Sequence, residues 1–222
     1  MKKIVKQESL ADQAFNSLKD AIIAGRLEQE EELTEEKLAS DLGISRTPIR
    51  EALKRLAADG LVNIHNARPA TVATFTKEDC LHYMEIRKLL EIHNIEKNAD
   101  RLYEEVLYEL KKNLEGQIEA IDSNDYNSFI DLDREFHLLL ANIGDNVKLI
   151  ELINQLNTSV NRAFLLLSNT LPVSAMDAYV EHTKIVQALQ SSEKNLAKQL
   201  MIIHLDNVEK RFLNYYNEEE NK

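Results

Sequence analysis

The sequence predicts a mainly α protein, in which a winged helix-turn-helix with three helices and a two-stranded wing precedes an all-α antiparallel helical bundle. Helix-breaking residues are concentrated before residue 70, where three of the five glycines and two of the three prolines lie. The rest of the chain has few helix breakers and carries six amphipathic segments, which is typical of a bundle. We therefore place the domain boundary between residues 76 and 77 of the 222-residue chain.

Three short helices are predicted before residue 60. Residues 9–24 place apolar side chains at helical spacing, and a second helix should run from Thr34, its N-cap, to Leu42. The Gly43-Ile44 pair that follows is the tight turn expected between the two helices of a helix-turn-helix. Ser45 should cap a third helix, which Gly60 ends.

The third helix has one apolar and one basic face. Its inward positions are Ile49, Ala52, Leu53 and Leu56. This spacing leaves Arg46, Arg50 and Lys54 in a row on the other side, with Arg55 beside them. Such a stripe is usually only a solvated charged surface, but the helix and turn before it favour a DNA-reading helix. Residues 61–64 and 71–75 alternate around Arg68-Pro69 and read as the wing.

The charge is distributed unevenly along the chain. The formal net charge is −11, and residues 1–75 hold 11 Lys and Arg against 12 Asp and Glu, so nearly all of the acidity belongs to the second part. A net negative charge opposes binding to nucleic acid, but ionic screening over about 8–10 Å limits the reach of a separate acidic region. For binding to DNA, the local basic stripe therefore matters more than the overall negative charge.

The cysteine content and hydropathy indicate an intracellular protein. The lone Cys80 cannot form an internal disulfide, and the sequence shows neither a signal peptide nor a long apolar run. We expect a cytoplasmic location and no membrane partner.

Residues 9–75 resemble the winged helix-turn-helix of GntR-type bacterial transcription regulators. The resemblance rests on Ala-Ile-Ile-Ala-Gly-Arg-Leu (21–27), Leu-Ala (38–39) and the highly specific string Leu-Gly-Ile-Ser-Arg-Thr-Pro-Ile-Arg-Glu-Ala-Leu-Lys-Arg-Leu (42–56). It implies that Ser45, Arg46, Thr47 and Arg50 touch DNA, and that the wing around Asn66 and Arg68 reaches a groove edge. We expect Lys54 to contact phosphate. The chain departs from the family at Glu30 to Glu32, where a Pro-Gly turn is frequent, and at Pro69, where glycine is frequent.

Three histidines in the bundle are predicted to point inward. The six helical segments span 77–98, 102–122, 125–142, 146–169, 174–191 and 193–216. His137 follows Asp133 by one helical turn on an apolar face, and His182 and His204 also align with apolar neighbours. A single such residue is usually a hydrogen-bonded core histidine, but three histidines and a carboxylate together favour a divalent metal site.

The second part of the chain resembles the FCD-type ligand-sensing domain of the FadR branch of GntR regulators. The matching pieces are 85–91, 133–137, 144–146, 181–185 and 197–205. Members with this pattern hold zinc, nickel or manganese, and many bind a small carboxylate beside it. By this resemblance Asp133, His137, His182 and His204 are the metal ligands.

Two arginines are candidates for holding the anionic group of an effector. An inward-facing Arg87 or Arg162 could bind a carboxylate through paired hydrogen bonds. The alternatives are that Arg87 pairs with Glu91 one turn later and that Arg162 extends to solvent.

The sequence thus predicts a homodimeric, non-enzymatic regulator that binds a near-palindromic double-stranded operator under control of a small carboxylate effector at a metal site. One alternative is a metal-responsive regulator in which the ion is the signal. A metal hydrolase is the other alternative, and the absence of an inward Glu or His beyond the four ligands speaks against it.

Overall fold

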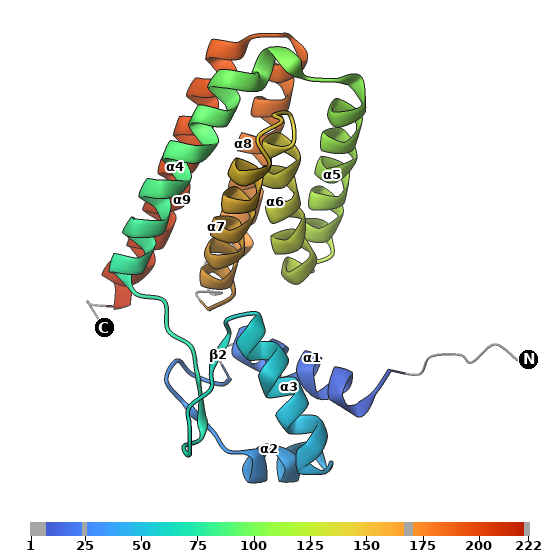
Figure 1. The fold of residues 1–222 in the computed structure, drawn as a ribbon, viewed down its shortest axis with the longest axis vertical. Coiled ribbons are helices and arrows are strands. Elements are labelled where there is room, and N and C mark those ends of the chain that lie inside the picture. The colour runs from blue at the N-terminus through green and yellow to red at the C-terminus, as the bar shows by residue number, and fades with distance from the viewer. Residues whose placement is uncertain (1–7, 24–25, 167–170, 220–222) are drawn as a thin grey trace, which may run out of the picture. The chain divides into compact units, whose positions relative to one another are not determined.

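The computed structural model describes residues 8–23, 26–166 and 171–219 (Figure 1). The chain separates into two compact units, Met1–Phe75 and Thr76–Lys222, and each is described by itself. No helix in the described ranges combines the length and the apolar composition that crossing a membrane requires.

The N-terminal unit contains the three predicted helices, α1 (Leu10–Ile23), α2 (Glu35–Leu42) and α3 (Arg46–Ala58). The Thr34 hydroxyl accepts a hydrogen bond from the backbone N–H of Lys37, as expected for the N-cap of α2. Gly43 follows α2 with a φ of 66°, a left-handed conformation that glycine adopts without strain. The tight turn of the helix-turn-helix is therefore confirmed.

A small antiparallel sheet, which contains the predicted wing, completes this unit. Its strands are β1 (Glu32–Leu33), β2 (Val62–Asn63) and β3 (Ala70–Val72), in the order β1-β3-β2. In this register Glu32 and Asn63 both face Thr71, on opposite sides of β3. The predicted two-stranded wing is thus present as the antiparallel pair β2–β3, and β1 adds a third strand to its sheet. The additional strand comes from the acidic connector, where two residues are too few to show a strand period.

The inward face predicted for α3 is its buried face. Ile49, Ala52 and Leu56 are fully buried, and Leu53 is 4% exposed. Helix α3 packs against α1, and the apolar face of α1 is buried as well. Packing of α3 against α1 leaves the basic side of α3 in solvent.

The C-terminal unit is an all-α bundle (Figure 1). Its helices are α4 (Lys77–Asn98), α5 (Glu104–Asp122), α6 (Tyr126–Ala141), α7 (Val147–Leu166), α8 (Leu171–Gln190) and α9 (Lys194–Glu219), with a short 3-10 turn η1 (Ala99–Arg101) after α4. Helices α4 and α9 run side by side at one edge, and α5 lies at the opposite edge. All six predicted helices are present.

The fifth helix of the bundle begins earlier than predicted. The sequence predicts residues 174–191, but α8 begins at Leu171 and has Pro172 in its first turn. Proline is tolerated there because the first turn of a helix has no partner for the missing N–H. The predicted extension of α7 to residue 169 lies outside the described residues.

The turn after α6 passes close to α4. A Cβ on Gly144 would lie 2.5 Å from Nδ2 of Asn98, so any larger residue would force the Asn98 side chain to move. The side chain of Asn94 donates to the carbonyl oxygen of Leu140 at 2.7 Å. These contacts hold α4 against α6 and bring the polar side chains of the two helices together.

Candidate metal centre and nucleic-acid interface

The exposed side of α3 carries the residues predicted to contact DNA. Ser45, Arg46, Thr47, Arg50 and Lys54 are all exposed, and we call this set the recognition face. A groove of about 370 Å³ runs along it, lined in part by Arg46, Arg50, Lys54 and Arg68. Asn66 and Arg68 are exposed in the turn between β2 and β3. The fold therefore brings the predicted residues of α3 and of the wing to one surface.

Both arginines of the recognition face are engaged by acids of α2. The Arg50 guanidinium donates from Nε and Nη2 to the two oxygens of Glu35, at 2.8 and 2.7 Å. Arg46 contacts Glu36 at 2.6 Å. The hydrogen bond from Arg50 lowers the pKa of Glu35, so this carboxylate stays ionised. The stripe is thus partly neutralised, which its composition did not predict.

Arg55 does not belong to the recognition face. Its Nη1 donates to Asp12 of α1 at 2.6 Å, and its guanidinium lies 4.3 Å from the ring centroid of Phe15. This side chain joins α3 to α1. Ser45 is the N-cap residue, but its hydroxyl forms no capping hydrogen bond, which corrects the predicted role of its side chain.

Three histidines from three helices meet inside the bundle. His137 of α6, His182 of α8 and His204 of α9 form what we call the histidine cluster. The Nε2 atom of His204 lies 3.3 Å from Nε2 of His137 and 3.4 Å from Nε2 of His182. Each of the three side chains is at most 1% exposed. The predicted convergence of these histidines is therefore present in the fold.

The other ring nitrogen of each histidine faces an oxygen atom. His137 Nδ1 lies 2.6 Å from Glu91 Oε2, His182 Nδ1 lies 3.0 Å from Gln117 Oε1, and His204 Nδ1 lies 2.7 Å from Glu181 Oε2. Because these oxygens only accept hydrogen bonds, each Nδ1 must carry a proton in the neutral ring. Each Nε2 then presents a lone pair to the other two.

The orientation of the Gln117 amide follows from a chain of hydrogen bonds. Asn113 Nδ2 donates to the backbone oxygen of Leu132, so Asn113 Oδ1 must accept from Gln117 Nε2, at 2.7 Å. This places Oε1 of Gln117 toward His182.

The three Nε2 lone pairs point inward with no proton between them, so they repel one another. A cation at their centre would remove this repulsion.

Asp133 lies at the edge of the histidine cluster. Its Oδ1 atom is 3.7 Å from Nε2 of His182, and its buried Oδ2 has no hydrogen-bond partner among the described residues. The tight grouping of possible ligand atoms contains the three histidines alone. An unpaired buried carboxylate oxygen is costly, and a cation would satisfy it together with the imidazoles.

Two imidazoles of this cluster, those of His182 and His204, are neutral at physiological pH. Burial, together with the neighbouring histidines, holds the pKa of His182 well below its usual value. Burial also lowers the pKa of His204 to about 4, although its hydrogen bond with Glu181 acts in the opposite direction. Neutral imidazole is the form that binds a metal ion.

Arg87 is buried and reaches the cluster through Glu91. Its Nε donates to Glu91 Oε1 at 2.7 Å, which is the pairing that the sequence left as an alternative. Its buried Nη1 and Nη2 atoms have no hydrogen-bond partner in the described part of the chain. Burial opposes ionisation of Glu91, but the charge of Arg87 and the hydrogen bond from His137 keep the pKa of Glu91 well below its usual value. The side chain of Arg162 lies outside the described residues.

The sequence analysis missed the residues behind the histidines. Glu91 and Glu181 are acids directly beside the histidine cluster, which contradicts the expectation that no inward Glu lies near the proposed ligands. Both carboxylates contact Nδ1 atoms and guanidinium groups, so they are placed to orient rings rather than to activate water. The only signals in the sequence are the spacing from Arg87 to Glu91 and the Glu181-His182 pair.

Comparisons with protein families match both units. Residues 10–72 match the family described as bacterial regulatory proteins, gntR family. Residues 82–207 match the FCD domain.

The chain is 31% identical over 195 residues to YdhC, an HTH-type transcriptional regulator of Bacillus subtilis, and the match covers 87% of each protein. It is 28% identical over 177 residues to the HTH-type transcriptional repressor RspR of Escherichia coli, over 79% of this chain and 77% of that protein. These relatives are regulators rather than enzymes.

Solved structures share the fold. The E. coli protein McbR/YncC is 25% identical, with a TM-score of 0.67, and the match covers 95% of this chain and all of that one. A structure described as the metal-free FCD domain of TM0439 matches 65% of this chain and 99% of its own length, with 22% identity and a TM-score of 0.53.

Proposed function

Because the chain belongs to the GntR family of bacterial regulatory proteins and carries an FCD domain, we propose that this DNA-binding transcriptional regulator responds to a small carboxylate effector at a divalent metal ion in its helical unit. The observation that carries this proposal is the convergence of three Nε2 lone pairs beside the unpaired carboxylate oxygen of Asp133.

The ion would be held by His137, His182, His204 and Asp133. Neutral imidazoles and a carboxylate suit zinc, nickel or manganese. Four protein ligands leave coordination positions free on an octahedral ion, and through these the metal would bind an effector carboxylate. Glu91, Gln117 and Glu181 would fix the imidazole orientations.

Arg87 is the residue that supports an anionic effector. Its two Nη atoms are buried without a partner among the described residues, and unpaired buried donors are costly. An effector carboxylate would satisfy them. Arg162 of α7 stays the second candidate for this role, because a guanidinium beside the metal could hold a carboxylate through paired hydrogen bonds.

DNA recognition would run through the recognition face. Arg46 and Arg50 would read bases, Ser45, Thr47 and Lys54 would contact the backbone, and the wing would place Asn66 and Arg68 at a groove edge. A bidentate arginine contact to guanine contributes about 1–3 kcal/mol of discrimination, so Arg50→Ala should lose preference for the operator over random DNA. Equal operator affinity for this variant and the parent would exclude Arg50 from recognition.

The outer side of α4 supports a homodimer on a near-palindromic operator. Leu81, Ile86 and Leu89 are 40, 48 and 66% exposed, an unusual concentration of apolar side chains on one helix. A twofold axis would place the same helix of a second copy against it.

The proposal is tested by measuring operator binding of the full chain under three conditions: after removal of metal, with zinc or nickel restored, and with metal plus candidate carboxylic acids. A response to acids only when metal is present supports the proposal. A full response to metal alone supports instead a regulator in which the ion is the signal. His204→Ala should abolish the response, whereas His82→Ala, at an exposed position on α4, should retain it.

A further inference from the structure

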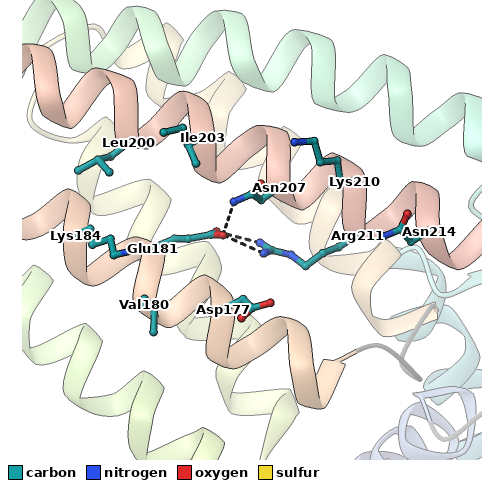
Figure 2. Close-up of a pocket in the computed structure, with 10 residues that line it drawn as sticks. All are labelled: Asp177, Val180, Glu181, Lys184, Leu200, Ile203, Asn207, Lys210, Arg211 and Asn214. Carbon is teal, nitrogen blue, oxygen red and sulfur yellow. Dashed lines mark hydrogen bonds and ion pairs between the residues drawn. The ribbon is translucent and has the colours of Figure 1, made fainter.

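A groove on the outside of the bundle lies between α8 and α9 (Figure 2). Its volume is about 580 Å³. The groove is distinct from the centre of the histidine cluster, whose side chains are almost wholly buried. We call it the α8–α9 groove.

The groove combines apolar and basic side chains. Val180 and Ile203 are 42 and 52% exposed, and Leu200 lies beside them. Lys184 and Lys210 also line the groove, and neither forms an ion pair within the described part of the chain. Exposed apolar groups next to unpaired ammonium groups suit a ligand with an apolar body and an anionic end.

The acids of the groove do not cancel these cations. Glu181 lies at its floor, where Oε1 accepts from Asn207 at 2.8 Å and both oxygens contact the Arg211 guanidinium at 3.2 Å (Figure 2). The charge of Glu181 is thus already balanced by the guanidinium of Arg211. Asp177 is the other acid that lines the groove.

Glu181 connects the floor of the groove directly to the histidine cluster. The same Glu181 oxygen that contacts Arg211 Nη2 accepts from Nδ1 of His204. A ligand that moved Arg211 or Asn207 would change how Glu181 holds the His204 ring. Residues that orient a metal ligand in this way commonly change metal affinity by about 10–100-fold when they are altered.

We propose that the α8–α9 groove is a second ligand site, separate from the effector site at the metal, which binds a small aliphatic carboxylate and is coupled to His204 through Arg211 and Glu181. Only the coupling rests on the proposed metal site. Lys184 holds the carboxylate, the apolar side chains hold the aliphatic chain, and Arg211 is a positioning residue for Glu181.

The binding part is tested on the full chain after metal removal, by titration with pentanoate and observation of isoleucine and valine methyl groups by NMR. The methyl signals of Val180 and Ile203 should shift, while those of the fully buried Ile153 in α7 should stay. Pentanamide, which lacks the charge, and acetate, which lacks the chain, should each bind several-fold more weakly. Absence of shifts at Val180 and Ile203, or equal binding of pentanamide, overturns the proposal.

Two variants locate the site. Lys184→Ala should weaken pentanoate binding several-fold, and Lys112→Ala, at an exposed lysine of α5, should not. Equal effects of the two substitutions contradict the assigned site. Because these titrations contain no metal, their result is independent of whether the histidine cluster binds an ion.

The coupling is tested by calorimetric titration of the metal-free chain with zinc. Arg211→Lys keeps the charge but loses the paired contact with Glu181, so the zinc affinity should fall by about tenfold. Added pentanoate should change the zinc affinity of the parent protein and leave that of Lys184→Ala unchanged. Zinc binding that is unaffected by both Arg211→Lys and pentanoate excludes the coupling, and a parent chain that binds no zinc contradicts the proposed function instead.

Discussion

The two units use the same chemical pair in opposite environments. In the N-terminal unit Arg50 Nε lies 2.8 Å from a Glu35 oxygen, with side chains 61 and 31% exposed. In the helical unit Arg87 Nε lies 2.7 Å from a Glu91 oxygen, with side chains 1 and 4% exposed. An exposed pair contributes about 0–1 kcal/mol and exchanges partners easily, whereas breaking a buried pair costs several kcal/mol. The first arrangement suits an arginine that must release its partner to contact DNA, and the second suits a fixed scaffold for a histidine.

The largest expected effect comes from breaking the buried pair. Arg87→Met should destabilise the helical unit by about 3–5 kcal/mol, because Glu91 would keep its charge without its main partner. The same substitution at Arg50 should change stability by less than about 1 kcal/mol. All seven tyrosines lie in residues 76–222 and the chain has no tryptophan, so tyrosine near-ultraviolet circular dichroism during denaturation reports on the helical unit. The stability of the N-terminal unit, which contains Arg50, is measured from its own transition in differential scanning calorimetry. Similar losses from the two substitutions would remove the distinction between the pairs.

The second-largest effect should come from acid, which we expect to lower the stability of the helical unit. His204 has a pKa of about 4 in the folded chain, against 6.5 for the ordinary side chain, so the unfolded chain takes up a proton first as the pH falls. The metal-free helical unit should therefore lose about 3 kcal/mol of stability between pH 6.5 and pH 4 from this residue. Glu181, with its pKa lowered to about 2, adds a further loss below pH 4.5.

This acid sensitivity is measured by urea denaturation at a series of pH values, with the tyrosine signal as the probe. His204→Gln should flatten the dependence between pH 6.5 and pH 4. An unchanged slope in that variant would mean that other groups carry the acid sensitivity.

Metal removal should lower the stability of the helical unit by a comparable amount, and this amount depends on the metal concentration. An ion at 100 times its dissociation constant stabilises the folded state by about 2.7 kcal/mol, so a chelator should lower the melting temperature of the helical unit. The three-helix N-terminal unit contains no residue of the histidine cluster, and its own transition should stay in place. Differential scanning calorimetry with and without chelator, on the parent and on His137→Ala, provides the measurement. A chelator effect of the same size in His137→Ala would assign it to another site.

The smallest expected effect is at the exposed pair. Glu35→Gln removes a negative charge from the recognition face and frees Arg50, so binding to random DNA should strengthen several-fold while folding stability changes little. Asp41→Asn, at an exposed acid near the other end of α2, is the control of equal charge change. Fluorescence anisotropy with operator and random duplexes at several salt concentrations measures both affinities. Equal strengthening by the two substitutions would indicate a general charge effect rather than release of Arg50.

The elements that could be predicted from sequence are those with a repeating pattern of apolar residues. Periodic apolar positions predicted the helices and the buried side of α3, and the same period placed His137, His182 and His204 inward. The strand β1 was missed because two residues carry no period. The contacts of Glu91 with His137 and of Gln117 with His182 join residues 46 and 65 positions apart, so no local pattern could predict them. The contact of Arg55 with Asp12 of α1 joins residues 43 positions apart, so it too could not be predicted from a local pattern.

The depth of the histidine cluster also determines how fast its contents can be exchanged. Its three side chains are at most 1% exposed and belong to three helices, so an ion held by them leaves only when those helices separate locally. The residence time of the ion would then depend on the frequency of such openings, which can be far slower than diffusion. The metal occupancy of such a slowly exchanging site would reflect the earlier metal supply rather than the present concentration of free metal.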